Sequence, residues 1–273
     1  MSDILFSSVP LILASLGALF SEYAGILAVF MDGVINFSAF LTFALYAGTS
    51  NIFVSVILSV LICVLMIFFF ALITEKSKMN PFLSATAINL IFSSFTSLLS
   101  SIIFHTRGVL TSKAFVFDYE EVKWVWLCLT VLISVFSVLL LFKTPHGLYL
   151  RITGSDSDVL DVKGVSSARC RIYAWMLSAG FAALSGAVLC LKINSFVPNI
   201  SAGRGWIALA AVFIGQKKIW RVVVAVIIFC TADYFGITLQ AVLPGAALNA
   251  LPYFVALLLI SIPRYNSHYG SSK

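Results

Sequence analysis

The sequence predicts an all-α membrane protein, a polytopic bundle of about eight to ten transmembrane helices with one broken or re-entrant segment. Of the 273 residues, 61% are hydrophobic and only 10% are charged, and the mean hydropathy is +1.06. A soluble globule of this composition would lack the polar residues to cover its surface. Several apolar runs also reach the roughly 20 residues that cross a hydrocarbon core, where the backbone must be helical.

The apolar runs follow one another along the whole chain. The first covers 4–20, and the glycine-punctuated region 24–47 is the candidate for the broken segment. Further spans are expected at 52–73, 82–104, 123–142, 171–191, 221–239 and 246–262, with a short apolar piece at 205–215. No segment outside the membrane is long enough to bury a core of its own. We therefore expect one integral domain over residues 1–273.

The positions of Lys and Arg predict the orientation. Twelve of the seventeen basic residues fall in four segments that can share one side of the membrane: 74–80, 143–171, 217–221 and the tail from 264. The positive-inside rule places this side in the cytoplasm. The net charge of +6 is then a sign of topology, and we expect no nucleic-acid partner.

The positions of the charged residues leave two possibilities for the side of the membrane on which the N-terminus lies. No Lys or Arg precedes Lys76, so the bias gives no direct signal there. Counting spans backwards from residue 74 puts the first residues outside the cell. If the region 24–47 enters and leaves on one side, the chain starts in the cytoplasm instead.

A long polar loop at about 144–170 interrupts the apolar spans. Within it, Ser155 followed three residues later by Asp158 resembles a capping box, and Gly164 would close the short helix that it opens. The apolar positions of this helix, Val159, Leu160 and Val162, would face a partner or the bilayer surface. The alternative is a plain connector between two helices, although a connector needs fewer residues.

Two carboxylates fall inside apolar spans, where an ionisable group is a functional candidate. Asp32 lies in the broken region and has two readings: contact with a solute, or capping of the second half-helix of that region. Asp233 contacts the solute or forms a hydrogen bond across helices. Asn36 and Asn89 either line a water-filled route or join neighbouring helices.

The stretch GRGWIALAAVFIG at 203–215 is too short to span the bilayer. A helix of this length is tolerated against protein or a water-filled cavity, so we expect it to line the central pathway. An interfacial hairpin is the alternative. Two aromatic residues of this stretch, Trp206 and Phe213, are candidates to face the solute. The tentative pathway set is therefore Asp32, Asn36, Asn89, Trp206, Phe213 and Asp233.

Neither catalysis nor metal binding is predicted for this chain. The five cysteines have no ligand spacing and are most simply small buried hydrophobes. The three histidines have no carboxylate cluster around them. The chain contains no G-x-x-x-x-G-K-[ST] motif, and so lacks this phosphate cradle for ATP.

Four segments together resemble one family, the permease subunits of bacterial ABC importers for simple sugars, nucleosides, riboflavin and branched-chain amino acids. LGALFSEYAG resembles its opening L-G-G-L-F-S-E-R-x-G, and SAGRGWIALAAVFIGQ resembles T-A-G-R-G-F-I-A-L-A-A-V-I-F-G. ALPYFVALLLI resembles the closing L-P-Y-L-x-T-L-x-x-L, and HGLYLRITGSDSDVLDVKGVSSARCR resembles the cytoplasmic segment. The chain departs from the family at Ser155, Asp156 and Ser157, which replace E-N-P, and at Ala28–Met31, which replace N-I-G-L.

The resemblance implies a role for the polar loop. In this family the loop carries a coupling helix that docks into a groove of the ATPase subunit. Carried over, it assigns coupling to Gly154, Ser155, Asp156, Asp158, Val159, Leu160 and Gly164. It also implies four partners, which are a second homologous permease, a cytoplasmic ABC ATPase that binds the ATP, an extracytoplasmic substrate-binding lipoprotein and the lipid of the bacterial plasma (inner) membrane.

Two other functions remain open from the residues alone. An ion-coupled secondary transporter would work without an ATPase and would need coupling sites at broken helices, which Asp32 and Asp233 could supply. An intramembrane enzyme would depend on Asp32, Asp233 and His105, which form no recognisable catalytic spacing.

Overall fold

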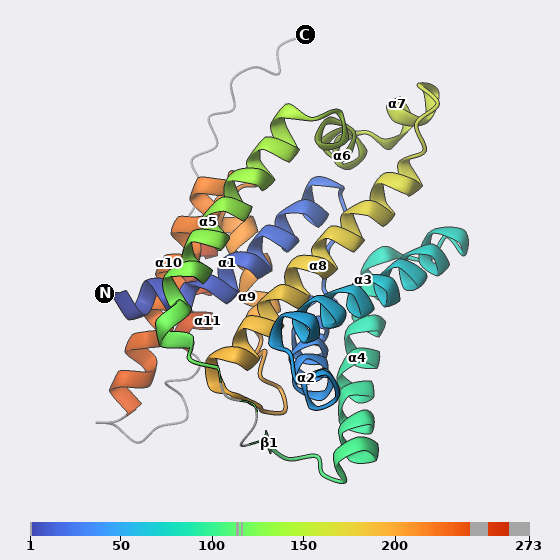
Figure 1. Cartoon of the computed structure of the whole chain (residues 1–273). Coiled ribbons are helices and arrows are strands. Elements are labelled where there is room, and N and C mark those ends of the chain that lie inside the picture. The colour runs from blue at the N-terminus through green and yellow to red at the C-terminus, as the bar shows by residue number, and fades with distance from the viewer. Residues whose placement is uncertain (1, 113–114, 116, 241–250, 262–273) are drawn as a thin grey trace.

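The computed structural model describes residues 2–112, 115, 117–240 and 251–261, and nearly all of them are helical. In chain order the helices are α1 (Ser2–Tyr23), α2 (Met31–Thr49), α3 (Ile52–Lys76), α4 (Pro81–Phe104), α5 (Tyr119–Lys143), α6 (Pro145–Ser155), α7 (Ser157–Val162), α8 (Ser167–Ile193), α9 (Arg204–Gly215), α10 (Ile219–Gln240) and α11 (Leu251–Ser261). Strands β1 (Leu110–Thr111) and β2 (Ser195–Phe196) pair antiparallel. The predicted polytopic helical bundle is confirmed (Figure 1).

Six of the described helices are long and apolar enough to cross a membrane: α1, α3, α4, α5, α8 and α10. Several begin at a polar residue whose side chain accepts a hydrogen bond from the first turn, as helix N-termini require. These caps are Asn51 for α3, Asn80 for α4 and Ser166 for α8. The predicted span 246–262 lies partly outside the described residues, which include only α11 of it.

Helix α8 lies at the centre of the bundle, in contact with α1, α2 and α3. Its middle is built from small residues, and Ala179, Ala182 and Ala183 are fully buried. Small side chains let helices approach closely in a membrane, where packing replaces the hydrophobic effect between helices. Helices α9, α10 and α11 pack together beside α1, and α5 also packs against α1.

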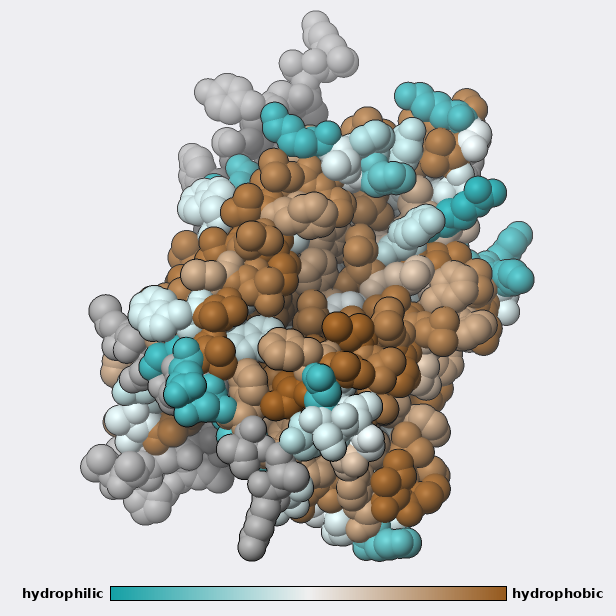
Figure 2. Space-filling model, viewed as in Figure 1, coloured by the Kyte–Doolittle hydropathy of each residue, from teal (hydrophilic) through white to brown (hydrophobic). Residues whose placement is uncertain are grey.

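The surface of the bundle is apolar in the middle and polar at its ends (Figure 2). Large hydrophobic side chains are exposed along the membrane-spanning helices, among them Phe69 on α3, Leu90 on α4 and Leu132 on α5. Such a surface is stable against lipid and would aggregate in water.

The course of α1 settles the side of the N-terminus relative to the polar loop. Near the start of α1, Ser7 Oγ accepts a hydrogen bond from Lys192 Nζ at 2.9 Å, at the far end of α8. At the other end, Tyr23 donates to the Lys217 carbonyl oxygen at 2.7 Å. Helix α1 therefore begins at the end of the bundle opposite α6 and α7 (Figure 1). With the polar loop in the cytoplasm, α1 begins outside the cell.

Candidate functional site

The chain breaks between α1 and α2, and the break places a helix N-terminus inside the bundle. Residues 24–30 are not helical, and α2 begins at Met31, which is fully buried. A helix N-terminus carries N–H groups with no partner in their own helix, and burying them requires an acceptor from elsewhere. The residue before α2, Phe30, provides no side-chain cap.

Asn89 of α4 supplies that acceptor. Its Oδ1 accepts a hydrogen bond from the Gly33 backbone N–H at 2.6 Å. Gly33 lies in the first turn of α2, so a side chain 56 residues away caps this helix. Asn89 therefore joins two helices, which is one of the two roles predicted for it from the sequence.

Asp32 caps a different helix from the one expected. Its Oδ1 accepts from the Gly205 N–H at 3.1 Å, and its Oδ2 accepts from Ser201 Oγ at 3.1 Å. Gly205 lies in the first turn of α9, so Asp32 stabilises the N-terminus of α9 and not that of its own helix. The approach is close because Gly205 has no side chain; a Cβ there would lie 2.8 Å from the Asp32 Cα.

Asn36 is in a different environment. The residue is only 8% exposed, and its Oδ1 has no hydrogen-bond partner among the residues that the structure describes. It lines a cavity of about 270 Å³ together with residues of α4 and of the loop before α9.

Helix α9 has one face that is partly exposed among the residues that the structure describes. Trp206 and Phe213 are 46% and 43% exposed, whereas Ile207, Ala208 and Ala211 are buried. The two aromatic residues are seven positions apart and share a helix face. With 12 residues, α9 is about 18 Å long, too short to span the bilayer.

Asp233 lies beside Arg204, the residue that precedes the Gly205 bonded to Asp32. It lines a cavity of about 500 Å³ between α1, α8, α9, α10 and α11, and its Oδ2 is 3.9 Å from Arg204 Nη2. Arg204 also donates to the Ile200 carbonyl oxygen at 3.1 Å. In the same cavity wall, Tyr253 donates to the Ala202 carbonyl oxygen at 2.6 Å. Arg204 is not among the pathway residues predicted from the sequence; its position two residues before Trp206 was the available signal.

The polar loop forms two short helices where one was expected. Ser155 ends α6, and its Oγ donates back to the Ile152 carbonyl oxygen at 3.1 Å. The predicted cap at Ser155 is therefore wrong: Asp156 Oδ1 accepts from the Asp158 N–H at 3.1 Å, one residue later in the chain. Gly164, with φ at +78°, follows α7, as expected for a helix-ending glycine.

The apolar residues of α7 do not all face outward. Leu160 is fully buried, because α7 packs against α6 and α8. Val159 and Val162 are 42% and 89% exposed. The expectation that Leu160 faces a partner is therefore replaced by a packing role inside this subunit.

Gly154 is packed against the break between α1 and α2. A Cβ at this position would overlap the Tyr23 carbonyl oxygen and lie 2.8 Å from the Gly25 nitrogen. No residue other than glycine fits here without moving α6 away. The contact joins the end of α6 directly to the segment that leads into α2.

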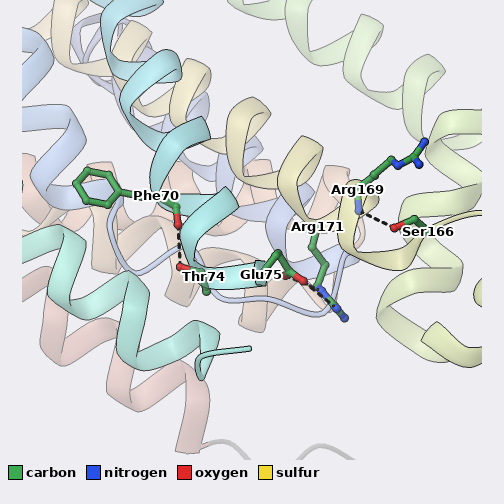
Figure 3. Close-up of polar contacts among 6 residues, drawn as sticks. All are labelled: Phe70, Thr74, Glu75, Ser166, Arg169 and Arg171. Carbon is green, nitrogen blue, oxygen red and sulfur yellow. Dashed lines mark hydrogen bonds and ion pairs between the residues drawn. The ribbon is translucent and has the colours of Figure 1, made fainter. Parts of the chain in front are cut away.

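Ion pairs join the neighbouring helix ends on the side of the polar loop. Arg171 in the first turns of α8 forms a bidentate pair with Glu75 near the end of α3, at 2.8 and 3.1 Å (Figure 3). Lys217 lies between α9 and α10, and its Nζ is 3.2 Å from Oε1 of Glu22 at the end of α1. Together with Gly154, these contacts connect the ends of helices that are distant in sequence, all on the side of the polar loop.

Comparison with known proteins identifies the family of this chain. Residues 1–262 match the family described as "Branched-chain amino acid transport system / permease component". The chain belongs to this family. This permease is therefore a transmembrane subunit of an ABC importer and a multi-pass protein of the plasma membrane. The family is one of permease subunits and not of catalytic subunits.

Several relatives extend over most of the permease. It is 23% identical to the nucleoside ABC transporter permease protein NupC of Lactococcus lactis, covering 96% of this chain and 90% of that one. It is 24% identical to the guanosine ABC transporter permease protein NupQ of Bacillus subtilis (92% and 88%). It is 26% identical to the putative glucose ABC transporter permease protein TsgC13 of Haloferax volcanii (85% and 74%).

The permease fold is also found in a solved structure. A chain of "PsaBC from Streptococcus pneumoniae in complex with Fab" superposes with a TM-score of 0.58 over 96% of this chain and 90% of that one. The sequence identity is 14%, so the similarity concerns the fold alone.

Proposed function

We propose that this permease forms half of the translocation pathway of an ATP-driven importer for nucleosides, with simple sugars as the second candidate class. Two of its relatives bear the names of nucleoside and guanosine permeases, and one bears the name of a glucose permease. Riboflavin remains a prediction from the family resemblance. ATP binds to a separate ATPase subunit, and this chain holds no cofactor.

The ATPase docks on α7. The observation that carries this assignment is the exposure of Val162, which is 89% exposed at the polar cytoplasmic end of the bundle, beside the half-exposed Val159. Val159 and Val162, three positions apart, form an exposed apolar pair on this helix, and this pair supports a partner that covers it. Movement of α7 reaches α6, and through Gly154 it reaches the turn that leads into α2.

A second permease completes the pathway. Helix α4 carries a polar stripe at helical spacing, formed by Thr86, Asn89, Ser93 and Ser97. Polar side chains in a membrane bundle typically face protein or a water-filled route. This stripe and the partly exposed face of α9 therefore belong to the pathway wall, which the partner permease closes. An extracytoplasmic lipoprotein delivers the solute at the opposite end from α7.

The docking assignment is tested by placing a charge on α7. In proteoliposomes that contain the permease pair, the ATPase and the loaded lipoprotein, Val162→Asp should lower ATP-driven uptake at least tenfold and weaken ATPase association. The matched control is Val109→Asp, the same substitution at an exposed valine near the opposite end, which should leave ATPase association unchanged.

The alternatives predict different results. Full uptake and normal ATPase association by Val162→Asp would refute docking on α7. Uptake that needs no ATP and is abolished by an ionophore would favour the ion-coupled transporter. Leu160 is unsuitable for the test, because a charge there disrupts the packing of α7 inside the subunit.

A further inference from the structure

The cavity between α1, α8, α9, α10 and α11 carries charges of both signs, from Arg204 and Asp233. Its volume of about 500 Å³ is within the range of about 300–1,000 Å³ that small-molecule sites usually occupy. Ser7 and Lys192, both exposed, line it at the end of the bundle opposite the polar loop. In the proposed function the lipoprotein delivers the solute at this end.

The charged pair lies at membrane depth. Helix α10 starts at Ile219 on the side of the polar loop, so Asp233 is about 20 Å along it at 1.5 Å per residue, within a hydrocarbon core of about 30 Å. Ionisable groups at this depth ordinarily face a partner or a water-filled cavity and mark the route of a solute. The side chains of Asp233 and Arg204 are 47% and 31% exposed and line the same cavity.

Neither charge is used up by the other. Arg204 Nη2 and Asp233 Oδ2 are 3.9 Å apart, which is longer than the roughly 3.2 Å of a hydrogen bond. Nη1 of Arg204 donates to the carbonyl oxygens of Ile200 and Ser201, whereas Nη2 donates to none of the described residues. The carboxylate of Asp233 can only accept, and no described residue donates to it. The cavity therefore offers an acceptor and a donor side by side.

Aromatic side chains form part of the same wall. Tyr234 and Tyr253 are 43% and 41% exposed and line the cavity. The Tyr253 hydroxyl already donates to the Ala202 carbonyl oxygen, and Lys192 donates to Ser7. The other described wall residues are apolar side chains and a buried cysteine. A planar ring can stack on such aromatic side chains while its polar edge forms hydrogen bonds.

We propose that Asp233 and Arg204 bind the Watson–Crick edge of a guanine base. This edge presents two neighbouring donors, N1–H and the 2-amino group, to a carboxylate, and beside them the O6 acceptor, which arginine commonly contacts in base recognition. Adenine has one donor group on this edge, and its N1 lone pair would face the carboxylate. The inference rests on the proposed function and adds to it the part of the solute that this permease recognises.

Binding without the lipoprotein tests the pair directly. Saturation-transfer NMR on the permease pair with its ATPase, in lipid nanodiscs, detects weak binding of nucleosides and ranks them by competition. The wild type should bind guanosine at least tenfold more tightly than adenosine. Inosine, which lacks the 2-amino group, should lie between them. L-Leucine would offer the pair an ammonium and a carboxylate, and displacement of guanosine by an equal concentration of leucine would overturn the base assignment.

Exchanging the carboxylate for an amide should invert the preference. Asn accepts one hydrogen bond and donates another, which matches the adenine edge. Asp233→Asn should therefore weaken guanosine binding at least tenfold and strengthen adenosine binding, a gain that misfolding cannot produce. Asp118→Asn is the matched control, because Asp118 is exposed and does not line the cavity; it should keep the wild-type ranking.

A modified ligand keeps the test decisive if Asp233→Asn does not assemble. 1-Methylguanosine lacks the N1–H donor and should bind the wild type at least tenfold more weakly than guanosine. Equal binding of the two compounds, or an unchanged ranking in an assembled Asp233→Asn variant, would refute the base site.

Uptake separates this inference from the proposed function. If proteoliposomes with the complete importer take up guanosine with ATP but the nanodiscs bind no guanosine, the base site is refuted while the importer stands. If the complete importer takes up no nucleoside with ATP, the nucleoside assignment fails, and the guanine site fails with it.

Discussion

Among single residues, Asp32 and Asn89 show how polar groups are kept inside an apolar bundle. Each caps the N-terminus of a helix that neither precedes nor follows it directly: Asn89 caps α2, and Asp32 caps α9. The buried N–H groups are satisfied without water, which the hydrocarbon region does not supply. These capping hydrogen bonds hold both side chains in place, at the edge of the proposed pathway.

Removing the Asp32 carboxylate should destabilise the permease. Asp32→Ala leaves the Gly205 N–H without its acceptor, at about 1–3 kcal/mol for a buried group, whereas Ser201 Oγ keeps Asn199 Oδ1 at 3.4 Å. Since about 1 kcal/mol shifts the Tm of a chain this size by roughly 2–4 °C, we expect the Tm of the purified protein to fall by about 2–12 °C.

Two variants calibrate this measurement. Asp32→Asn keeps one oxygen for Gly205 and should lose clearly less than Asp32→Ala. Asp233→Ala removes a long, partly exposed ion pair and should lower the Tm by no more than about 4 °C, since such pairs contribute about 0–1 kcal/mol. Equal shifts for the two alanine variants would show that Asp32 is not a cap.

Among the elements, α6 and α7 act together with the break between α1 and α2. Helix α7 lies at the end of the bundle that carries the polar loop and packs on α6, and α6 reaches the break through Gly154 (Figure 1). In the proposed coupling, this close backbone contact would transmit a displacement of α6, because no flexible side chain lies between the two segments. The same break leads into α2, which carries Asn36.

A methyl group at Gly154 should separate these elements. Gly154→Ala overlaps the Tyr23 carbonyl oxygen, so we expect uptake to fall at least tenfold while the ATPase still associates through α7. Gly48→Ala is the matched control: Gly48 is also helical, and an added Cβ there meets nothing within 4 Å. Because alanine favours helices over glycine by about 0.5–1 kcal/mol, Gly48→Ala should be neutral or slightly stabilising. Normal uptake by Gly154→Ala would exclude this route of coupling.

For the whole molecule, the distribution of polar groups indicates how the bundle is oriented in the membrane. The bundle presents apolar side chains to lipid along α3, α4 and α5 and gathers polar residues at its ends (Figure 2). Helix α1 is antiparallel to α8, so the first residues and the polar loop lie at opposite ends of the bundle. Charge counting left this point open because the first 75 residues contain no Lys or Arg.

Single cysteines should report this topology. In a Cys128→Ser background, the remaining four cysteines are buried. Leu5→Cys and Gly108→Cys should then react with a membrane-impermeant maleimide in intact cells. Lys163→Cys should react only after the membrane is permeabilised. Labelling of Lys163→Cys in intact cells would invert the orientation and remove the docking assignment.

Much of the fold could be read from the residues alone. The apolar runs, the Asn and Ser caps before α3, α4 and α8, and the shortness of α9 are local properties, and the sequence was sufficient to predict membrane insertion and most helix positions. The boundary of α7 was predicted one residue early because Ser155 and Asp156 are both good capping residues. Only the three-dimensional course of the chain shows that Ser155 still belongs to α6.

The sequence by itself determined that this protein spans a membrane as a helical bundle, which end of the bundle is basic and which helix is too short to cross. The tertiary structure alone decided that Asp32 and Asn89 cap neighbouring helices, that Leu160 is buried inside the subunit and that Asn36 lies beside a cavity. The reason is physical. Helix formation and insertion depend on residues a few positions apart, whereas the partner of a buried polar group is chosen by packing between segments as distant as Asp32 and Gly205, 173 residues apart.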